Sequence, residues 1–237
     1  MKRRLIIALS VALLATGVMM AKRAKRAARV TIIDFVNEFV ANPEDEFTGS
    51  VAQAWSKYLS RQPQDEGVQV EVDVKNGFMT YSYCDPEEPG NGLTMEMCYW
   101  NCADGKHKLV ANSVWSTTEG RVTYGQFDGL SFRLYDTATG TSTTVPSEDL
   151  GVNLYEGIEH VINGYDAENE LFFVQGPDGT SIYMNHDEWE EWYAKRPVNT
   201  VTLPRQGKDI LIVTHSGTTR LRERRLKWNG NGFTPAP

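Results

Sequence analysis

The sequence is poor in the residues that most often carry chemistry. Among its 237 residues there are only 3 cysteines and 4 histidines, and so few cysteines cannot build a disulfide-dense scaffold. The 20 glycines and 10 prolines are too few and too irregularly spaced for a collagen or a linker protein. A hydrophobic fraction of 41% excludes a wholly disordered chain. The length suits one domain, or at most two, with a substantial core.

Acidic residues are absent from the first 29 positions. Residues 1–29 hold eight basic side chains, whereas the remaining residues hold 16 basic and 31 acidic ones, a net charge of −15. A short cationic start followed by the apolar run 5–21 has the layout of a secretory signal. Residues 1–29 are therefore predicted to be a signal peptide with a basic flank. We expect the protein to be exported, either to a periplasm or to the extracellular space.

Two features of the same segment favour a membrane anchor instead. The apolar run ends in Met19-Met20-Ala21 rather than in the small residues typical of a cleavage site. The basic run from Lys22 to Arg29 follows at once and opposes translocation. A helix over 5–21 would span about 26 Å, the short end for a membrane helix. If it is uncleaved, the protein would contact the membrane only through residues 5–21.

Two helices are expected next, within residues 30–63. The first covers about 31–40, where apolar residues recur at helical spacing, and Asn42-Pro43 ends it because proline lacks an amide donor. The second covers about 47–59 and has an apolar stripe that includes Val51 and Trp55. Each helix has a single apolar face, so we expect both to pack against the rest of the protein.

From residue 68 the hydrophobic period changes to two. Val68, Val70 and Val72 alternate with polar residues, which predicts a half-buried strand. Asn76-Gly77 comes next and predicts a tight hairpin into a strand over 78–84. The further expected strands cover 93–101, 108–115, 130–135, 141–145, 158–162, 170–175, 180–184, 198–203, 209–215 and 219–228.

These short strands predict a mainly β fold, an antiparallel meander, sandwich or barrel, behind the N-terminal helical pair. Turns are expected at several residue pairs that end in glycine, among them Asn163-Gly164. One short helix over Asp187–Lys195 interrupts the strands. We expect a single β-rich domain over 30–237, with its antiparallel part over 68–237 and a possible seam near 146–154.

The cysteine positions predict one disulfide bond if the protein is exported. Cys98 and Cys102 would lie about 13 Å apart along a strand, beyond the ~7 Å limit for bridged Cα atoms. Cys84, on the preceding strand, is therefore expected to pair with Cys98 or Cys102 across the hairpin. Two alternatives are open: reduced cysteines packed in the core, or a metal or redox pair at Cys98 and Cys102, which only His107 would support.

No catalytic motif is found. No Gly-x-Ser-x-Gly sequence surrounds any serine, and the expected disulfide argues against a Cys102–His107 nucleophile pair. Acidic turns at 85–88, 166–170 and 187–191 match no calcium-binding loop and are interpreted as solvated turns. No metal or cofactor is therefore predicted. Paired carboxylates on different strands remain open, because they leave no signature in a sequence.

Aromatic residues are the remaining candidates for ligand binding. Trp189, Trp192 and Tyr193 have helical spacing among glutamates, and such an aromatic face with an acidic rim suits a protein or a glycan. The alternative is that this helix caps an open end of the β structure. The basic strand from Arg220 to Lys227 is expected to pair with acids on neighbouring strands. Because the net charge of −15 repels a polyanion, no nucleic-acid partner is expected.

The sequence therefore favours an exported, β-rich binding or interaction module without catalytic activity, whose ligand is an unidentified protein or glycan. The alternative is a secreted hydrolase or glycan-processing enzyme that uses carboxylates from different strands.

Overall fold

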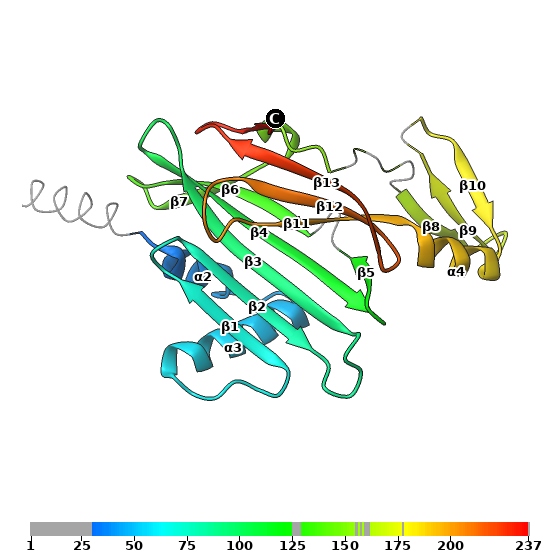
Figure 1. Ribbon diagram of the computed structural model, residues 1–237, viewed down its shortest axis with the longest axis horizontal. Coiled ribbons are helices and arrows are strands. Elements are labelled where there is room, and N and C mark those ends of the chain that lie inside the picture. The colour runs from blue at the N-terminus through cyan, green and yellow to red at the C-terminus, as the bar shows by residue number, and fades with distance from the viewer. Residues whose placement is uncertain are drawn as a thin grey trace, which may run out of the picture.

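The computed structural model describes residues 30–124, 129–154, 156, 158, 162–176 and 178–236. The predicted signal peptide or anchor over 1–29 lies outside these residues. Within the described residues the fold is mainly β, with antiparallel sheets and three α-helices (Figure 1). None of these helices is long and apolar enough to cross a membrane.

The predicted helical pair is confirmed as α2 (Ile32–Phe39) and α3 (Glu46–Ser60). Each helix begins at a capping residue. The Thr31 amide donates to Asp34 at the first helix, and Asp45 accepts the Thr48 amide at 2.6 Å at the second. These caps satisfy amides that the helices leave unpaired, so both helices start where the sequence provides an acceptor.

Seven strands form the largest sheet, in the order β1-β2-β3-β4-β6-β7 with β5 paired to β4. The predicted hairpin joins β1 to β2, but Asp73 pairs with Phe78, so the connection has the four residues 74–77 and is not the two-residue turn expected at Asn76-Gly77. Of those two residues only Gly77 has a positive φ. The strands of this sheet are β1 (Val68–Asp73), β2 (Phe78–Cys84), β3 (Gly92–Asn101), β4 (His107–Thr118), β5 (Arg121–Tyr124), β6 (Leu130–Asp136) and β7 (Thr141–Val145).

Two smaller sheets follow along the chain. The first has the order β10-β9-β8 and the second the order β11-β12-β13-β14. Their strands are β8 (Ile162–Asp166), β9 (Leu171–Gln175), β10 (Ser181–Met184), β11 (Pro197–Thr202), β12 (Ile210–Ser216), β13 (Thr219–Trp228) and β14 (Phe233–Pro235). The helix α4 (His186–Lys195) joins the two sheets.

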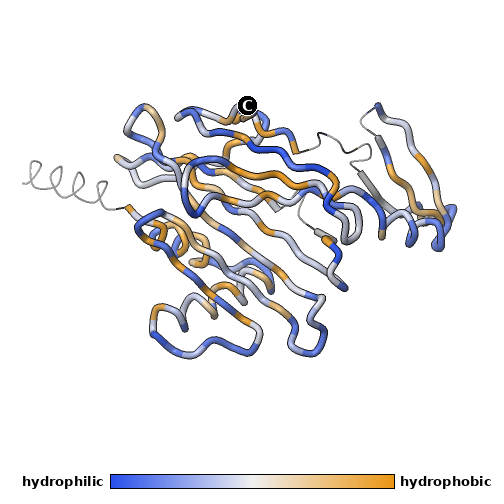
Figure 2. Tube along the Cα trace, in the orientation of Figure 1, coloured by the Kyte–Doolittle hydropathy of each residue, from blue (hydrophilic) through white to orange (hydrophobic). Residues whose placement is uncertain are grey.

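The two faces of the largest sheet bury different cores. On one face, α2 and α3 cover Met79, Met95 and Met97. On the other, the four-stranded sheet covers Trp100 and Phe132. The central strands therefore bury apolar residues on both faces, and Figure 2 shows hydrophobic residues interspersed with polar ones along them.

The possible seam near 146–154 is packed into the protein. It holds the short 3-10 helix η1 (Glu148–Leu150). Leu150, Val152 and Leu154 are all buried in the core between the two larger sheets. This segment joins the sheets through a shared core and is not an exposed linker.

One predicted turn is wrong. It was expected at Asn163-Gly164, but both residues lie inside β8. The strand predicted over 158–162 lies mostly outside the described residues, and only its last residue, Ile162, is seen in β8. Gly164 is needed for packing, because a Cβ atom there would lie 2.7 Å from the Phe173 ring on β9. The chain turns later, where Asp166 accepts the amides of Glu168 and Asn169.

The predicted disulfide is also corrected. Cys84 pairs with Gly92 across the hairpin, whereas Cys98 pairs with Phe78 at the other end of β2. Six residues of strand separate these two positions, about 20 Å, which is far beyond the reach of a disulfide. Cys102 lies beyond the end of β3, farther still from Cys84. All three thiols are free.

Candidate functional site

The small sheet and α4 form a unit that projects from the two larger sheets (Figure 1). We call β8, β9, β10 and α4 the aromatic unit. In its register, Phe172 of β9 pairs with Tyr165 and with Met184, and Phe173 pairs with Gly164 and with Tyr183. Because side chains alternate along a strand, Phe172 and Phe173 point to opposite faces of the sheet.

The predicted ligand-binding residues Trp189, Trp192 and Tyr193 pack onto one face of this sheet. Trp189 is stacked on Phe172 with ring centroids 4.9 Å apart and on Trp192 at 5.1 Å. Only 8% of Trp189 is exposed, and Tyr193 lies beside it at 5.6 Å. The helical spacing that groups these rings also turns them toward β9 and β10. They form the core of the aromatic unit and do not present a free binding face.

A second set of apolar side chains in the aromatic unit is open to solvent. Tyr165 is 53% exposed, Ile182 is 45% exposed and Tyr183 is 54% exposed. On the face away from α4, the Phe173 ring lies over Gly164 and 6.0 Å from the Tyr183 ring. Tyr165 pairs with Phe172 and Ile182 pairs with Val174, so both lie on the α4 face of the sheet, whereas Tyr183 lies on the opposite face. Sequence reasoning missed these residues, because strand alternation identifies two faces but does not show how much of each is covered.

Charge around these rings is strongly negative. Residues 162–196 contain eight acidic and two basic side chains. The β8–β9 turn carries Glu168 and Glu170, and both are exposed. The two basic residues are engaged within the unit: Lys195 donates to Glu191 at 2.6 Å, and the Arg196 guanidinium lies 3.5 Å from the centre of the Tyr193 ring.

A second candidate group is Glu96, on the central strand β3. Its carboxylate accepts the Leu203 amide at 2.6 Å, and burial raises its pKa to about 7. A charged residue between Met95 and Met97 was the sequence signal that could have found it. Groups with displaced pKa values gather at functional sites, although structural contacts displace them too.

The surroundings of Glu96 favour a structural contact. Glu71 lies two strands away on the same face, since both residues pair with Thr80. However, Arg205 donates to Glu71 at 2.8 Å and lies 3.4 Å from Asp73. The segment from Leu203 to Arg205 therefore crosses this part of the sheet and engages both glutamates. Glu71 and Glu96 are two carboxylates on different strands, as the alternative prediction of a hydrolase requires. However, both accept hydrogen bonds from the protein itself, Glu96 from the Leu203 amide and Glu71 from Arg205.

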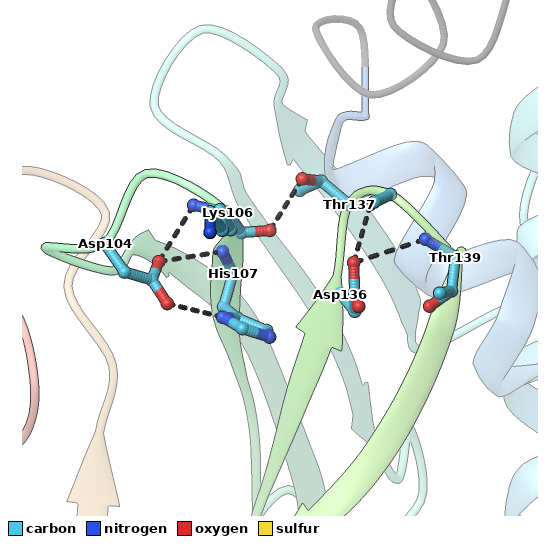
Figure 3. Close-up of polar contacts among 7 residues, drawn as sticks. Asp104, Lys106, His107, Asp136, Thr137 and Thr139 are labelled. Atoms are coloured by element: carbon cyan, nitrogen blue, oxygen red, sulfur yellow. Dashed lines mark hydrogen bonds and ion pairs between the residues drawn. The ribbon is translucent and has the colours of Figure 1, made fainter. Parts of the chain in front are cut away.

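His107 lies between two aspartates at the ends of two hairpins (Figure 3). Asp104 accepts the amides of Lys106 and His107, and its Oδ2 is 2.5 Å from His107 Nδ1. These contacts lower the pKa of Asp104 to about 2. Asp136 in the same way accepts the amide of Thr139 at 3.2 Å. Both aspartates stabilise turns, which is the usual role of such side chains.

Cys102 does not complete a nucleophile site with this histidine. Its amide donates to the His107 carbonyl at 3.0 Å, but no hydrogen bond joins the two side chains among the described residues. Burial raises the pKa of the Cys102 thiol, which disfavours the reactive thiolate. Among all the residues that the structure describes, no group of three or more His, Cys, Asp or Glu residues is placed to hold a metal ion.

The basic strand β13 finds acidic partners, although not on the expected strands. Arg222 and Arg224 donate to Glu156 at 2.7 and 2.5 Å. Arg220 contacts Glu223 of its own strand. The acidic partners come from β13 itself and from the connection before β8, because the neighbouring strands β12 and β14 carry no acidic residue.

Comparisons of the chain with families of proteins, with curated proteins and with solved structures found no match.

Proposed function

We propose that this protein is an exported binding module without catalytic activity, and that its contact surface lies on the aromatic unit. The observation that carries the proposal is the concentration of exposed apolar side chains there. Tyr165, Ile182 and Tyr183 are three of the seven large hydrophobic residues exposed in the described part of the chain. Tyrosine and phenylalanine are enriched at binding surfaces because they bury a large area at low entropic cost.

The construction of the unit supports the same proposal. The stack of Phe172, Trp189 and Trp192 covers one face of the sheet, so that Tyr183 on the opposite face is held on a rigid support. Gly164 leaves room for the Phe173 ring over the neighbouring strand, next to Tyr183. A pre-ordered aromatic surface loses little conformational freedom when a partner binds.

The test uses the full chain, immobilised through its C-terminus, and two arrays of probes: oligosaccharides and short peptides of random sequence. The variant Tyr183→Ser is compared with Leu221→Ser, which removes an apolar side chain of similar exposure, 57% against 54%. Circular dichroism checks that both variants fold.

We expect Tyr183→Ser to weaken binding to the probes that the parent protein retains by about tenfold, the loss typical of an aromatic contact residue. Leu221→Ser is expected to bind as the parent protein does. The proposal is overturned if the parent protein retains no probe on either array, or if the two variants bind alike.

A further inference from the structure

The outer strand of the aromatic unit has a free edge. Among the described residues β10 pairs with β9 alone, and it lies on the side of the unit away from the two larger sheets (Figure 1). An edge strand presents a row of backbone N–H and C=O groups that are open to another chain. β10 therefore offers a partner its backbone as well as its side chains.

The turn before β10 shows which residues direct their backbone groups to this edge. The Gly176 amide donates to the Thr180 carbonyl at 3.0 Å, so these two residues form a hydrogen-bonded pair. Hydrogen-bonded and non-hydrogen-bonded pairs alternate along an antiparallel ladder. Counted from Thr180, Ser181 and Tyr183 fall in non-hydrogen-bonded pairs with β9. Their N–H and C=O groups therefore point away from β9, toward the free edge.

The exposed side chains of β10 lie on both faces of the sheet. Ile182 pairs with Val174 on the α4 face, and Tyr183 pairs with Phe173 on the opposite face. A partner that covers one face would bury only one of the two exposed side chains. A strand added at the edge contacts both, because its own side chains alternate between the same two faces.

Charged residues, which protect strand edges, are missing from β10. In the described part of the chain two other strand edges expose a large apolar side chain, Tyr165 on β8 and Leu221 on the part of β13 that precedes its pairing with β14. A charged residue adjoins each of them: Asp166 follows Tyr165, and Arg220 and Arg222 flank Leu221. Charges on an edge oppose pairing with another chain. β10 contains no charged residue, so its edge favours an uncharged strand.

We propose that the partner of the aromatic unit is an extended, uncharged protein segment that adds to the edge of β10 as a further strand. This inference rests on the proposed function, and it selects a protein over a glycan. The backbone of the segment pairs with Ser181 and Tyr183, which provides affinity for any extended chain. Neighbouring apolar side chains of the segment lie against Ile182 on one face and against Tyr183 on the other, which provides selectivity.

A second copy of the chain is the alternative occupant, and charges at the two ends of β10 oppose it. Two copies that pair edge to edge around a two-fold axis place their β10 strands antiparallel. Asp178, in the turn before β10, would then approach Asp187 of the other copy, which follows the strand at the start of α4. Like charges across a strand pair are destabilising, and an uncharged peptide brings no such repulsion.

The test measures the binding of three labelled peptides to the full chain by fluorescence anisotropy. The first has the central run Val-Tyr-Val-Tyr between serine and glycine flanks. The second has the same sequence with a methyl group on every central amide, which removes the backbone donors and keeps the side chains. The third has serine in place of both tyrosines, so that only one face is apolar. We expect the second peptide to bind at least tenfold more weakly than the first, and the third about fivefold more weakly.

Matched variants test whether both faces of β10 contact the peptide. Ile182→Ser and Tyr183→Ser remove exposed apolar side chains from opposite faces, and Leu221→Ser makes the same change on the edge of β13. We expect each of the first two variants to weaken binding of the first peptide by about fivefold to tenfold, and Leu221→Ser by less than twofold. Loss in only one of the two β10 variants would mean that the partner lies on a single face and would overturn the inference.

Sedimentation velocity tests the alternative occupant. We expect the full chain to be a monomer at the protein concentrations of the binding assay. A dimer that Ile182→Ser and Tyr183→Ser dissociate would overturn the inference in favour of a second copy.

The failure of this inference is distinguishable from failure of the proposed function. If the methylated peptide binds as tightly as the first and Tyr183→Ser weakens both, the aromatic unit binds through side chains alone and the inference fails. If the parent protein binds none of the three peptides but retains oligosaccharides that Tyr183→Ser loses, the partner is a glycan and again only the inference fails. If Tyr183→Ser binds every probe as the parent protein does, both proposals fail.

Discussion

Replacement of Glu96 by glutamine tests whether burial of this carboxyl costs stability at neutral pH. Glu96 has an ordinary pKa of 4.5, and burial raises that pKa to about 7 in the folded protein. Between these two pH values the folded state therefore binds more protons than the unfolded state. The free energy of unfolding must then fall as the pH rises from 4.5 to 7, and it must be insensitive to this group outside that window.

The magnitude follows from the separation of the two pKa values. It corresponds to about 3 kcal/mol, since each pH unit of separation is worth about 1.4 kcal/mol. Glutamine has nearly the same shape and its carbonyl oxygen can still accept the Leu203 amide. We therefore expect Glu96→Gln to be more stable than the parent protein by about 3 kcal/mol at pH 8 and nearly equal to it near pH 4.5.

The assay is urea denaturation of both proteins at several pH values between 4.5 and 8. Subtraction of one curve from the other cancels other groups, including His215, whose pKa is lowered by burial. Glu87→Gln, an exposed substitution, serves as a control and is expected to change the stability by less than about 0.5 kcal/mol. Parallel curves for the parent protein and Glu96→Gln would refute the reasoning. A variant less stable at pH 8 would mean that the charged carboxylate gains more from Leu203 than it loses by burial.

The remaining predictions concern the thiols and the buried contacts. Without reductant, a thiol reagent is expected to modify exposed Cys84 in the folded protein and buried Cys98 only after unfolding. Mass spectrometry after each step checks this order. A disulfide in the mass spectrum would contradict the strand register. Asn199→Ala is expected to lower the unfolding free energy by roughly 2–3 kcal/mol in denaturant titrations, because it leaves the buried hydroxyl of Thr214 without an acceptor; a loss below ~0.5 kcal/mol would show that the site adapts. Trp189→Ala is expected to cost roughly 3–5 kcal/mol and to abolish the near-ultraviolet dichroism of the stacked indoles, whereas an unchanged spectrum would place that signal elsewhere.

Much of the secondary structure could be predicted from local patterns. The alternation of Val68, Val70 and Val72 and the turn signal at Asn76-Gly77 together predict the first hairpin, which the structure confirms with a longer connection, residues 74–77. Both N-terminal helices also follow from nearby residues: a cap, an apolar stripe and a proline. These features depend on contacts within a few residues, so they are visible in a sequence.

The predictions that proved wrong are those in which pairing with another strand determines the conformation. Asn163-Gly164 is a turn signal by its neighbours, but the Phe173 ring of β9 needs that glycine inside a strand. The disulfide was predicted from the position of cysteines on adjacent strands, yet the register placed Cys84 and Cys98 at opposite ends of the hairpin. Register and ring packing depend on pairing between strands, which no local pattern contains.

The sequence by itself determined the charge of the protein, its predominance of short strands, the hairpin at Asn76-Gly77 and the helical spacing of Trp189, Trp192 and Tyr193. Only the tertiary structure decided which aromatic rings are free. Spacing along a helix groups side chains on one face, but whether that face meets solvent depends on what packs against it. Here β9 and β10 cover the predicted rings, and nothing among the described residues covers Tyr165 and Tyr183 to the same degree. Burial depends on contacts between residues that are far apart in the sequence, and a local sequence pattern does not contain these contacts.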